Sequence, residues 1–534
     1  MIIKNGTVWH TYTTKSFKYK DADKVATLLI KTGIFSGILT NEGRFTFLAG
    51  ENPQSVKLDM NYHNNGQAVK VSGMQPVHAS VSCVLTKASL LNCINIRLSE
   101  HKLFYIDDIP FSENIILCAK PVIIKTESKD ITLHPIVRLY KIGLSQVTLV
   151  DFEEHNLELK TFFKDIIDLP FQLNDSIKTS IDFAIASLKL DYSGFPLTSR
   201  ILEKRKLNNY IRKLRSAAYK MKSLEGDSQG YYVDYGKALG IRNNLSDISR
   251  YIVAIINSKL FKKTIKNPMK GMDLSKFYSA WYGKPSIFIF EHEKQMSDAL
   301  KNHDKNKKLI SALINKNYHL INEGKVKNYI DHRAFNDFNF FCEQSATLTL
   351  ASGKVTKEGF TQTYTPKNMM WDNQIKSELR DFIAYFYDST INKIKNERSH
   401  IGLAEIQEEV IRFEEWLRIF SRKYGEIQEF AFRLNESADI QKMRHNLTTM
   451  LKARMLVIKL KEADISENSN KKITMAFGLL ATTSLSPIIK PLFDTFGLTP
   501  YIKKYNLSSY NEIFYFIGAV FIVFILIKLI NRSK

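Results

Sequence analysis

The spacing of hydrophobic residues changes along this 534-residue chain and predicts regions of different structure. Up to about residue 165 the hydrophobic positions have a period of two, which is typical of strands with one buried face. They alternate over residues 56–62 and stop at Asn65-Gly66, a dipeptide that favours tight hairpin turns. A second alternating stretch turns at Gly143. We therefore expect residues 1–165 to form a β-rich cytoplasmic domain.

The next region, residues 166–335, combines helical periods with one clear strand, "PSIFIF", and predicts an α/β cytoplasmic domain. One of its predicted helices surrounds an apolar stripe with Lys and Arg. Guanidinium groups bind phosphate oxygens in pairs, so these arginines are candidate ligand-binding residues, although a solvated helix face explains the same pattern. The candidates are Arg200, Arg205, Arg212 and Arg215.

A long helical region follows, and we expect residues 366–466 to form a coiled-coil-like stalk. From Ile406 to Leu434 the apolar positions alternate four and three apart, which is the heptad spacing of packed helices. Gly425 lies within this stretch and is its weak point, because glycine costs a helix interior about 1 kcal/mol. Such a helix can transmit a domain movement or serve as a passive stalk.

Two apolar segments at the carboxyl end, Ile473–Ile489 and Ile513–Ile530, predict a transmembrane hairpin over residues 467–534. Basic residues flank both segments on the same side, which indicates that both termini are cytoplasmic. Small and polar residues recur every four positions in the first segment and are candidate pore-lining residues; a contact between packed helices explains them equally well. These residues are Thr474, Gly478, Thr482 and Ser486.

Composition adds a strong positive charge and excludes several classes of site. The 76 Lys and Arg residues exceed the 54 Asp and Glu residues, for a net charge of +22, which favours an anionic partner. The four cysteines have no metal-binding spacing, and no phosphate-binding loop, dinucleotide fingerprint or hydrolase motif occurs. We therefore expect no catalytic residues, no metal and no cofactor, and a protein that is not an enzyme.

The order of these regions, together with one short motif, resembles the CorA-like family of two-transmembrane transporters. That family carries an aromatic-Gly-Met-Asn signature after its first membrane helix, and Phe496-Gly497-Leu498-Thr499 stands at that place here. The aromatic residue and the glycine match, whereas Met and Asn are replaced. Pro487 lies ten residues before Gly497, as in the family. The resemblance covers the carboxyl-terminal part of the chain and implies a homo-oligomer, a pentamer in the family.

The replaced signature residues and the large cytoplasmic region make the chain most similar to the CorA-like membrane effectors associated with type III CRISPR systems. This resemblance implies a pore in the inner membrane that an adenylate-type anionic ligand gates, with an antiviral role. Its partners would be the lipid bilayer, further copies of the chain and the nucleotide, and nucleic acid is not expected. A divergent magnesium transporter and a membrane-anchored interaction scaffold are the alternatives. The expected fold is a multidomain membrane protein with β-rich, α/β, stalk and hairpin regions in that order.

Overall fold

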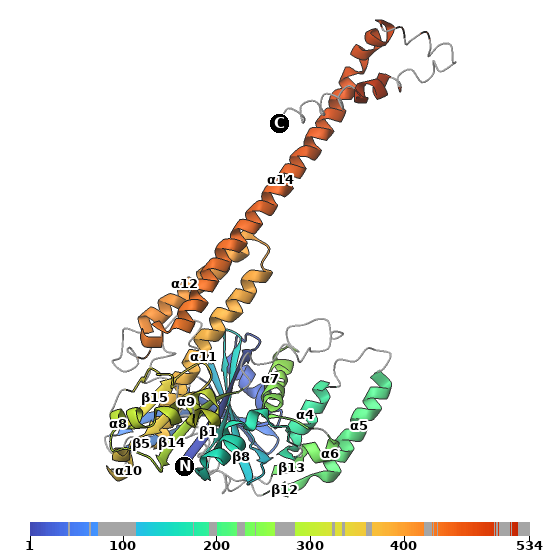
Figure 1. The fold of residues 1–534 in the computed structure, drawn as a ribbon. Helices are drawn as coiled ribbons and strands as arrows, with labels where there is room; N and C mark the ends of the chain where they lie inside the picture. Colours follow the sequence, from blue (N-terminus) through green and yellow to red (C-terminus); the bar gives the residue numbers. More distant parts are fainter. Residues whose placement is uncertain are drawn as a thin grey trace. The chain divides into compact units, whose positions relative to one another are not determined.

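A computed structural model gives the fold of the chain (Figure 1) and divides it into two compact units. Unit 1 comprises Met1–Thr390 and Glu409–His445, and unit 2 comprises Ile391–Glu408 and Asn446–Lys534. The structure describes all residues except 41–42, 64–65, 73–113, 175, 192–199, 222–229, 241, 262–282, 323–325, 334–336, 359–365, 421–429, 431, 435, 496, 498–499, 501–512, 514 and 522–534.

Unit 1 is built on one large mixed sheet, in which the described strands are antiparallel except for one parallel pair, β14 with β16. Its main path is β15 (Phe338–Cys342), β16 (Thr347–Ala351), β14 (Lys284–His292), β1 (Ile2–Lys15), β9 (Leu144–Asp151), β8 (Asp130–Tyr140), β6 (Asn114–Ala119), β2 (Phe35–Thr40), β3 (Arg44–Ala49), β4 (Asn52–His63) and β5 (Gly66–Ser72). Shorter strands pair beside this path: β7 (Val122–Lys125), β10 (His155–Glu158), β11 (Ile177–Ser180), β12 (Tyr219–Met221) and β13 (Gly230–Asp234).

Both hairpins that the sequence predicts are present. β4 pairs antiparallel with β5, with His63 opposite Gly66. β8 pairs with β9 across the turn at Gly143, whose φ of 91° is a conformation that favours glycine. A Cβ atom at this position would lie 2.8 Å from the carbonyl oxygen of Ser16, so the turn also has no space for a side chain.

The described helices follow one another along the chain in this order. They are α1 (Ala22–Ile30), α3 (Leu159–Phe162), a π-helix (Phe163–Ile167), the 3-10 turn η2 (Leu169–Phe171), α4 (Ile181–Asp191), α5 (Arg200–Ala217), α6 (Tyr235–Leu239), α7 (Leu245–Phe261), α8 (Ala299–Lys305), α9 (Lys307–Asn315), the 3-10 turn η5 (Tyr318–Ile321), α10 (Gly353–Glu358), α11 (Pro366–Asn396), α12 (His400–Phe420) and α14 (Ala438–Thr495).

The two faces of the sheet differ in chemistry because successive side chains of a strand point to opposite sides. One face is apolar and contributes to the main hydrophobic core with α1, α7 and α9. The central strands supply Val8, Tyr12, Val137, Leu139, Val147, Leu149, Ile287, Ile289, Leu348 and Leu350 to this core.

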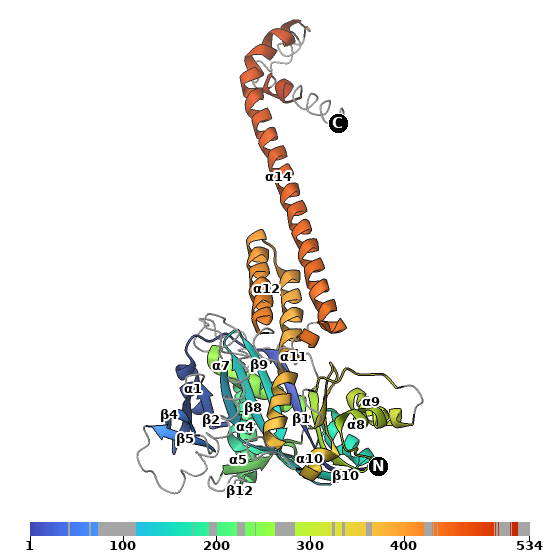
Figure 2. The same cartoon turned by 90° about the vertical axis from the view of Figure 1, so that its left-hand side faces the viewer.

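The opposite face is polar, and helix α11 covers it (Figure 2). Every residue of α11 from Met369 to Ala384 is buried, including several that carry charge. Side chains of the helix bond directly to the strands: Gln374 Nε2 donates to Thr11 Oγ1 at 2.8 Å, and Thr148 Oγ1 donates to Glu378 Oε1 at 2.6 Å. α11 is therefore held to the sheet by polar contacts in addition to aromatic packing, in which the Trp371 ring lies 4.5 Å from that of Trp9 and the Phe382 ring 5.2 Å from that of Tyr140.

Unit 2 consists of the end of α11, the start of α12 and most of α14. Arg454 of α14 donates from Nε and Nη2 to the carbonyl oxygen of Glu397, at 2.8 and 2.6 Å. The apolar positions Ile394, Leu403, Ile406, Leu447, Leu451 and Ile458 are buried. From Lys459 to Thr474, by contrast, every residue of α14 is exposed.

The predicted fold of a membrane protein with a terminal hairpin is wrong in two respects. No helix in the described part of the chain is long and apolar enough to cross a bilayer. The first predicted span, Ile473–Ile489, continues the charged helix α14 without interruption, and its 17 residues are at the lower limit for a span and are interspersed with Thr and Ser. Of the second, only Ile513 and residues 515–521 are described.

The expected separation into a β-rich domain and an α/β domain is the second error. Strand β1 pairs with both β9 and β14, so strands from residues 1–165 and from residues 166–335 form a single sheet. Of the predicted stalk helix from Ile406 to Leu434, α12 contains the part up to Phe420, and residues 421–429 lie outside the described part. Hydrophobic spacing records which face of a strand is buried but not which distant strand pairs with it.

His10 on β1 predicts that unit 1 loses stability in mild acid. Burial lowers the pKa of His10 to about 3, and its Nε2 lies 3.1 Å from the carbonyl oxygen of Ile166. The unfolded chain binds this proton near pH 6.5, so stability is complete above that pH and declines as the pH falls below it. Between pH 7 and about pH 5 this residue should cost the fold about 2 kcal/mol.

Urea unfolding at the two pH values, followed by circular dichroism, measures this loss. His10→Gln is the matched control, because the glutamine amide keeps a donor for Ile166 and has no titrating group. Its pH-dependent loss should be smaller than that of the native protein by about 2 kcal/mol. Equal losses in the two proteins would contradict the assignment to His10.

Candidate functional site

A cavity of 710 Å³ lies in unit 1 beside the first residues of the parallel strands β14 and β16. Its walls come from η2, the ends of β14 and α9, the loop that precedes β15, the turn between β15 and β16, and the segment that opens α14. The lining residues are Phe171, Gly283, Lys284, Asn315, Lys316, Lys327, Asn328, Tyr329, Ile330, Glu343, Gln344, Ser345, Ser437 and Asp439. Lysines, amides and aromatic rings therefore meet in one space.

Lys316 is held in an unusual backbone conformation at this cavity. It is the carboxyl-terminal cap of α9, with φ 55° and ψ 39°, and its N–H donates to the carbonyl oxygens of Ala312 and Leu313. Within the described residues it is the only non-glycine residue with a positive φ. Glycine is the usual residue at such a cap, because a side chain in this conformation costs about 1 kcal/mol or more. The chain carries this cost at a position where the side chain lines a cavity, and such outliers concentrate at functional sites.

Aromatic rings lie close to the side chains of Lys316 and Lys327. The ammonium group of Lys316 lies 5.3 Å from the centre of the Phe171 ring, and that of Lys327 lies 5.0 Å from the centre of the Tyr329 ring. Asn315 Nδ2 donates to the Tyr329 hydroxyl at 2.6 Å and so fixes that ring. In the described part of the chain, no carboxylate is within ion-pair distance of Lys316 or Lys327.

Burial shifts the pKa of one basic and one acidic side chain in this cavity, in each case toward the neutral form. Burial lowers the pKa of Lys316, and the Asp168 carboxylate offsets part of that change. Burial raises the pKa of Glu343, which the nearby Lys327 and Arg380 partly oppose. An anion entering the cavity would raise the pKa of both Lys316 and Glu343.

Two residues of the cavity wall are bonded to helix α11. Lys284 forms an ion pair with Asp381 at 2.9 Å, and both side chains are nearly inaccessible to water. Asp439 forms an ion pair with Arg380, which is also buried. The cavity is thus connected by direct contacts to the helix that covers the polar face of the sheet.

This arrangement is suited to binding an anion. Three lysines supply positive charge, amide side chains supply donors and acceptors, and Phe171 and Tyr329 supply ring faces. The described residues contain no group of three or more His, Cys, Asp or Glu side chains that could hold a metal ion.

The predicted ligand-binding arginines lie on α5 and do not line this cavity. Arg205, Arg212 and Arg215 are exposed, whereas the side chain of Arg200 lies outside the described part. Their predicted role as ligand-binding residues stays a prediction.

The predicted pore and loop residues are described only in part. Thr474 is exposed on α14 and its hydroxyl donates to the carbonyl oxygen of Asn470 at 2.8 Å. Gly478, Thr482 and Ser486 belong to the same helix, but their side chains lie outside the described residues. In the signature-like loop only Gly497 is described, in a turn with φ 64°. Phe496, Leu498 and Thr499 lie outside the description.

Sequence reasoning missed the cavity because its lysines have no shared motif. Lys284, Lys316 and Lys327 are separated along the chain and are brought together by the pairing of β14 with β16. The one available signal is the polar stretch Asn315-Lys316-Asn317, which ends an amphipathic helix. It marks a helix terminus but does not indicate a ligand.

Comparisons with protein-family models, with characterised proteins and with solved structures gave no match for this chain. The resemblance to the CorA-like family therefore stays a prediction.

Two substitutions at Lys316 separate backbone strain from charge. Lys316→Ala and Lys316→Gly both remove the ammonium group, but only glycine relieves the positive φ. We expect the glycine variant to be more stable than the alanine variant by about 1 kcal/mol. Urea unfolding of the two variants measures the difference, and equal midpoints would show that the cap is not strained.

Glu343 predicts how anion binding depends on pH. A bound anion raises further a pKa that burial has already raised, so the protein takes up a proton as it binds. Affinity for sulfate, whose own charge is constant over this range, should therefore increase as the pH falls from about 8 to 5. Glu343→Gln should bind more tightly at the higher pH and lose most of this dependence. Titration calorimetry at the two pH values tests both points; an unchanged dependence in the variant would exclude Glu343 as its source.

Proposed function

We propose that this protein is a receptor for a phosphate-bearing, adenylate-type ligand, which binds in the cavity of unit 1. The observation that carries the proposal is Lys316, held at a strained helix cap with its side chain at the cavity wall. A solvent-exposed lysine would gain nothing from this position, whereas a lysine that contacts an anion has a reason to occupy it.

The chemistry of the walls favours a nucleotide over a simple inorganic anion. The cavity volume of 710 Å³ lies within the range of small-molecule sites, and a single phosphate would leave most of it empty. Lys316 and Lys327 suit phosphate oxygens, and the rings beside them suit a planar base. Asn328 and Gln344 offer amide groups of the kind that read the edge of a base.

Binding would also act on helix α11. A phosphate group near Lys284 competes with Asp381 for its ammonium group, and it repels the Asp439 carboxylate that pairs with Arg380. Both effects weaken contacts of α11. Because α11 continues beyond Thr390 into unit 2, we propose that this helix reports ligand occupancy to the rest of the chain.

The channel that the sequence predicted is not part of this proposal. It requires membrane-spanning helices, and none is present in the described part of the chain. The retained part is the adenylate-type ligand, now assigned to the cavity lysines instead of the α5 arginines.

Equilibrium binding of AMP, a cyclic adenylate and inorganic phosphate tests the receptor. We expect an adenylate to bind more tightly than phosphate, and Lys316→Ala and Lys327→Ala each to weaken it about tenfold or more. Lys308→Ala is the matched control, because Lys308 is exposed on the same helix and does not line the cavity. Equal affinities in all three variants would refute the site.

Hydrogen exchange of α11 with and without the bound adenylate tests the relay separately. Weaker contacts at Asp381 and Arg380 should increase exchange over residues 376–384. Normal binding with unchanged exchange would refute the relay and leave the receptor intact.

A further inference from the structure

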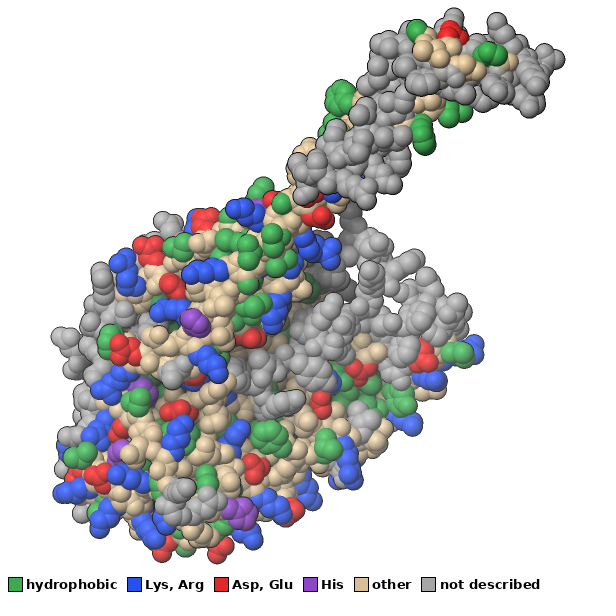
Figure 3. Space-filling view, turned by 45° about the horizontal axis from the view of Figure 1, so that its top comes forward, with side chains coloured by type: hydrophobic (Ala, Val, Ile, Leu, Met, Phe, Trp, Pro, Cys, Tyr) green, Lys and Arg blue, Asp and Glu red, His purple; other side chains and the backbone are tan. Residues whose placement is uncertain are grey.

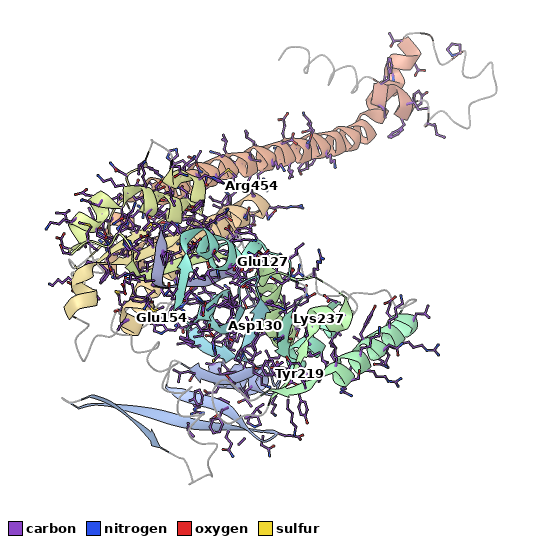
Figure 4. All side chains as sticks on the ribbon, turned by 60° about the horizontal axis from the view of Figure 1, so that its bottom comes forward. Glu127, Asp130, Glu154, Tyr219, Lys237 and Arg454 are labelled. Atoms are coloured by element: carbon purple, nitrogen blue, oxygen red, sulfur yellow. The ribbon has the colours of Figure 1, made fainter. Side chains whose placement is uncertain are left out.

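Helix α5 carries a cluster of Lys and Arg residues that do not line the cavity. Seven Lys and Arg residues are opposed by one acid, Glu203, which pairs with Lys206 at 3.1 Å. Arg205, Arg212 and Arg215 are exposed, and no carboxylate in the described residues is within ion-pair distance of them. Figure 4 shows α5 with side chains projecting outward from unit 1, and Figure 3 shows one face of the molecule, on which Lys and Arg side chains are interspersed with acids.

The position of α5 is fixed by apolar contacts on its other side. Leu214 is fully buried in a small cluster with Ala184, Leu188, Val233 and Tyr235, and Leu207 packs against it. Arg205 and Arg212 are seven residues apart, so they project in nearly the same direction, opposite to Leu214. Arg215 is turned about 80° around the helix from Arg205, so the three arginines are spread over the exposed side of a well-anchored helix.

An exposed aromatic ring, that of Tyr231, lies on the side of strand β13 that faces α5. Tyr231 and Val233 are two residues apart on β13, so both point to the face on which α5 packs. Tyr231 is 51% exposed, and the ammonium group of Lys220 on β12 lies 5.9 Å from the centre of its ring. Strand β12 begins at Tyr219, directly after α5 (Figure 4).

We propose that α5 and strands β12 and β13 form a binding surface for single-stranded nucleic acid. Arg205, Arg212 and Arg215 would contact successive phosphates, and Tyr231 would stack against a base. This surface is separate from the cavity, and the proposal does not depend on the adenylate receptor.

The geometry favours a polymer over the small anionic ligand that the sequence predicted for these arginines. From Arg205 to Arg215 the helix rises roughly 15 Å, too far for one small ligand to contact both. A single strand offers phosphates over that length and unpaired bases for the tyrosine ring, whereas the bases of a duplex are already stacked. An acidic protein segment would match the charge of the arginines but offers no planar base to stack on the Tyr231 ring.

Fluorescence anisotropy with the full chain and a labelled mixed-sequence oligonucleotide of about 12 nucleotides tests the surface. The logarithm of affinity should fall linearly with the logarithm of salt concentration. Replacing the three arginines by alanine should reduce the slope by about 2, because each phosphate contact on a single strand contributes about 0.7. A control that changes the exposed lysines 301, 305 and 308 to alanine removes the same charge elsewhere and should leave the slope unchanged.

Tyr231→Ala distinguishes nucleic acid from a generic polyanion. Loss of the ring should weaken oligonucleotide binding roughly fivefold or more without changing the salt slope. Binding of poly-glutamate should be weaker than that of the oligonucleotide and insensitive to this variant. Equal binding of poly-glutamate, no effect of Tyr231→Ala, or a lysine control that loses as much as the arginine variant would each overturn the proposal.

Discussion

Two buried ion pairs between the sheet and helix α11 govern the architecture of unit 1. Arg138 on β8 pairs with Glu378, and Lys284 on β14 pairs with Asp381, and all four side chains are nearly inaccessible to water. Removing one partner of such a pair is costly, typically 3–5 kcal/mol, because a charge is left buried without compensation. The pairs therefore determine where α11 lies on the sheet more sharply than apolar contacts could, since apolar packing has no direction.

This polar interface explains why the candidate site lies where it does. Lys284 is the first residue of β14, lines the cavity and forms an ion pair with α11. A single side chain therefore connects the sheet, the site and the helix. A ligand that changes the charge around Lys284 changes the environment of a buried pair, where electrostatic interactions are strong because water is excluded. An aliphatic interface between α11 and the sheet would be insensitive to the charge of a ligand.

The positive charge of the chain is divided between two different environments. In the cavity Lys284 is buried and Lys316 is half-buried, burial lowers the pKa of Lys316, and rings and amides surround both. On α5 the arginines are spread over the exposed side of the helix, with apolar contacts only on the opposite side. The net charge of +22 includes both the cavity lysines and the α5 arginines and does not distinguish them. Only their surroundings distinguish a site for a small anion from a surface for a long polyanion.

Local pattern determined the hairpins at Gly66 and Gly143 and the buried positions of α12 and α14, because alternation, turn residues and heptad spacing depend on near neighbours. The tertiary structure alone decided that β1 pairs with β14, and that Lys284, Lys316 and Lys327 share one cavity. It also decided that the segment after Lys472 belongs to a long charged helix. Pairing between distant strands and burial of charge depend on the whole assembly, and neither leaves a periodic signal in the sequence.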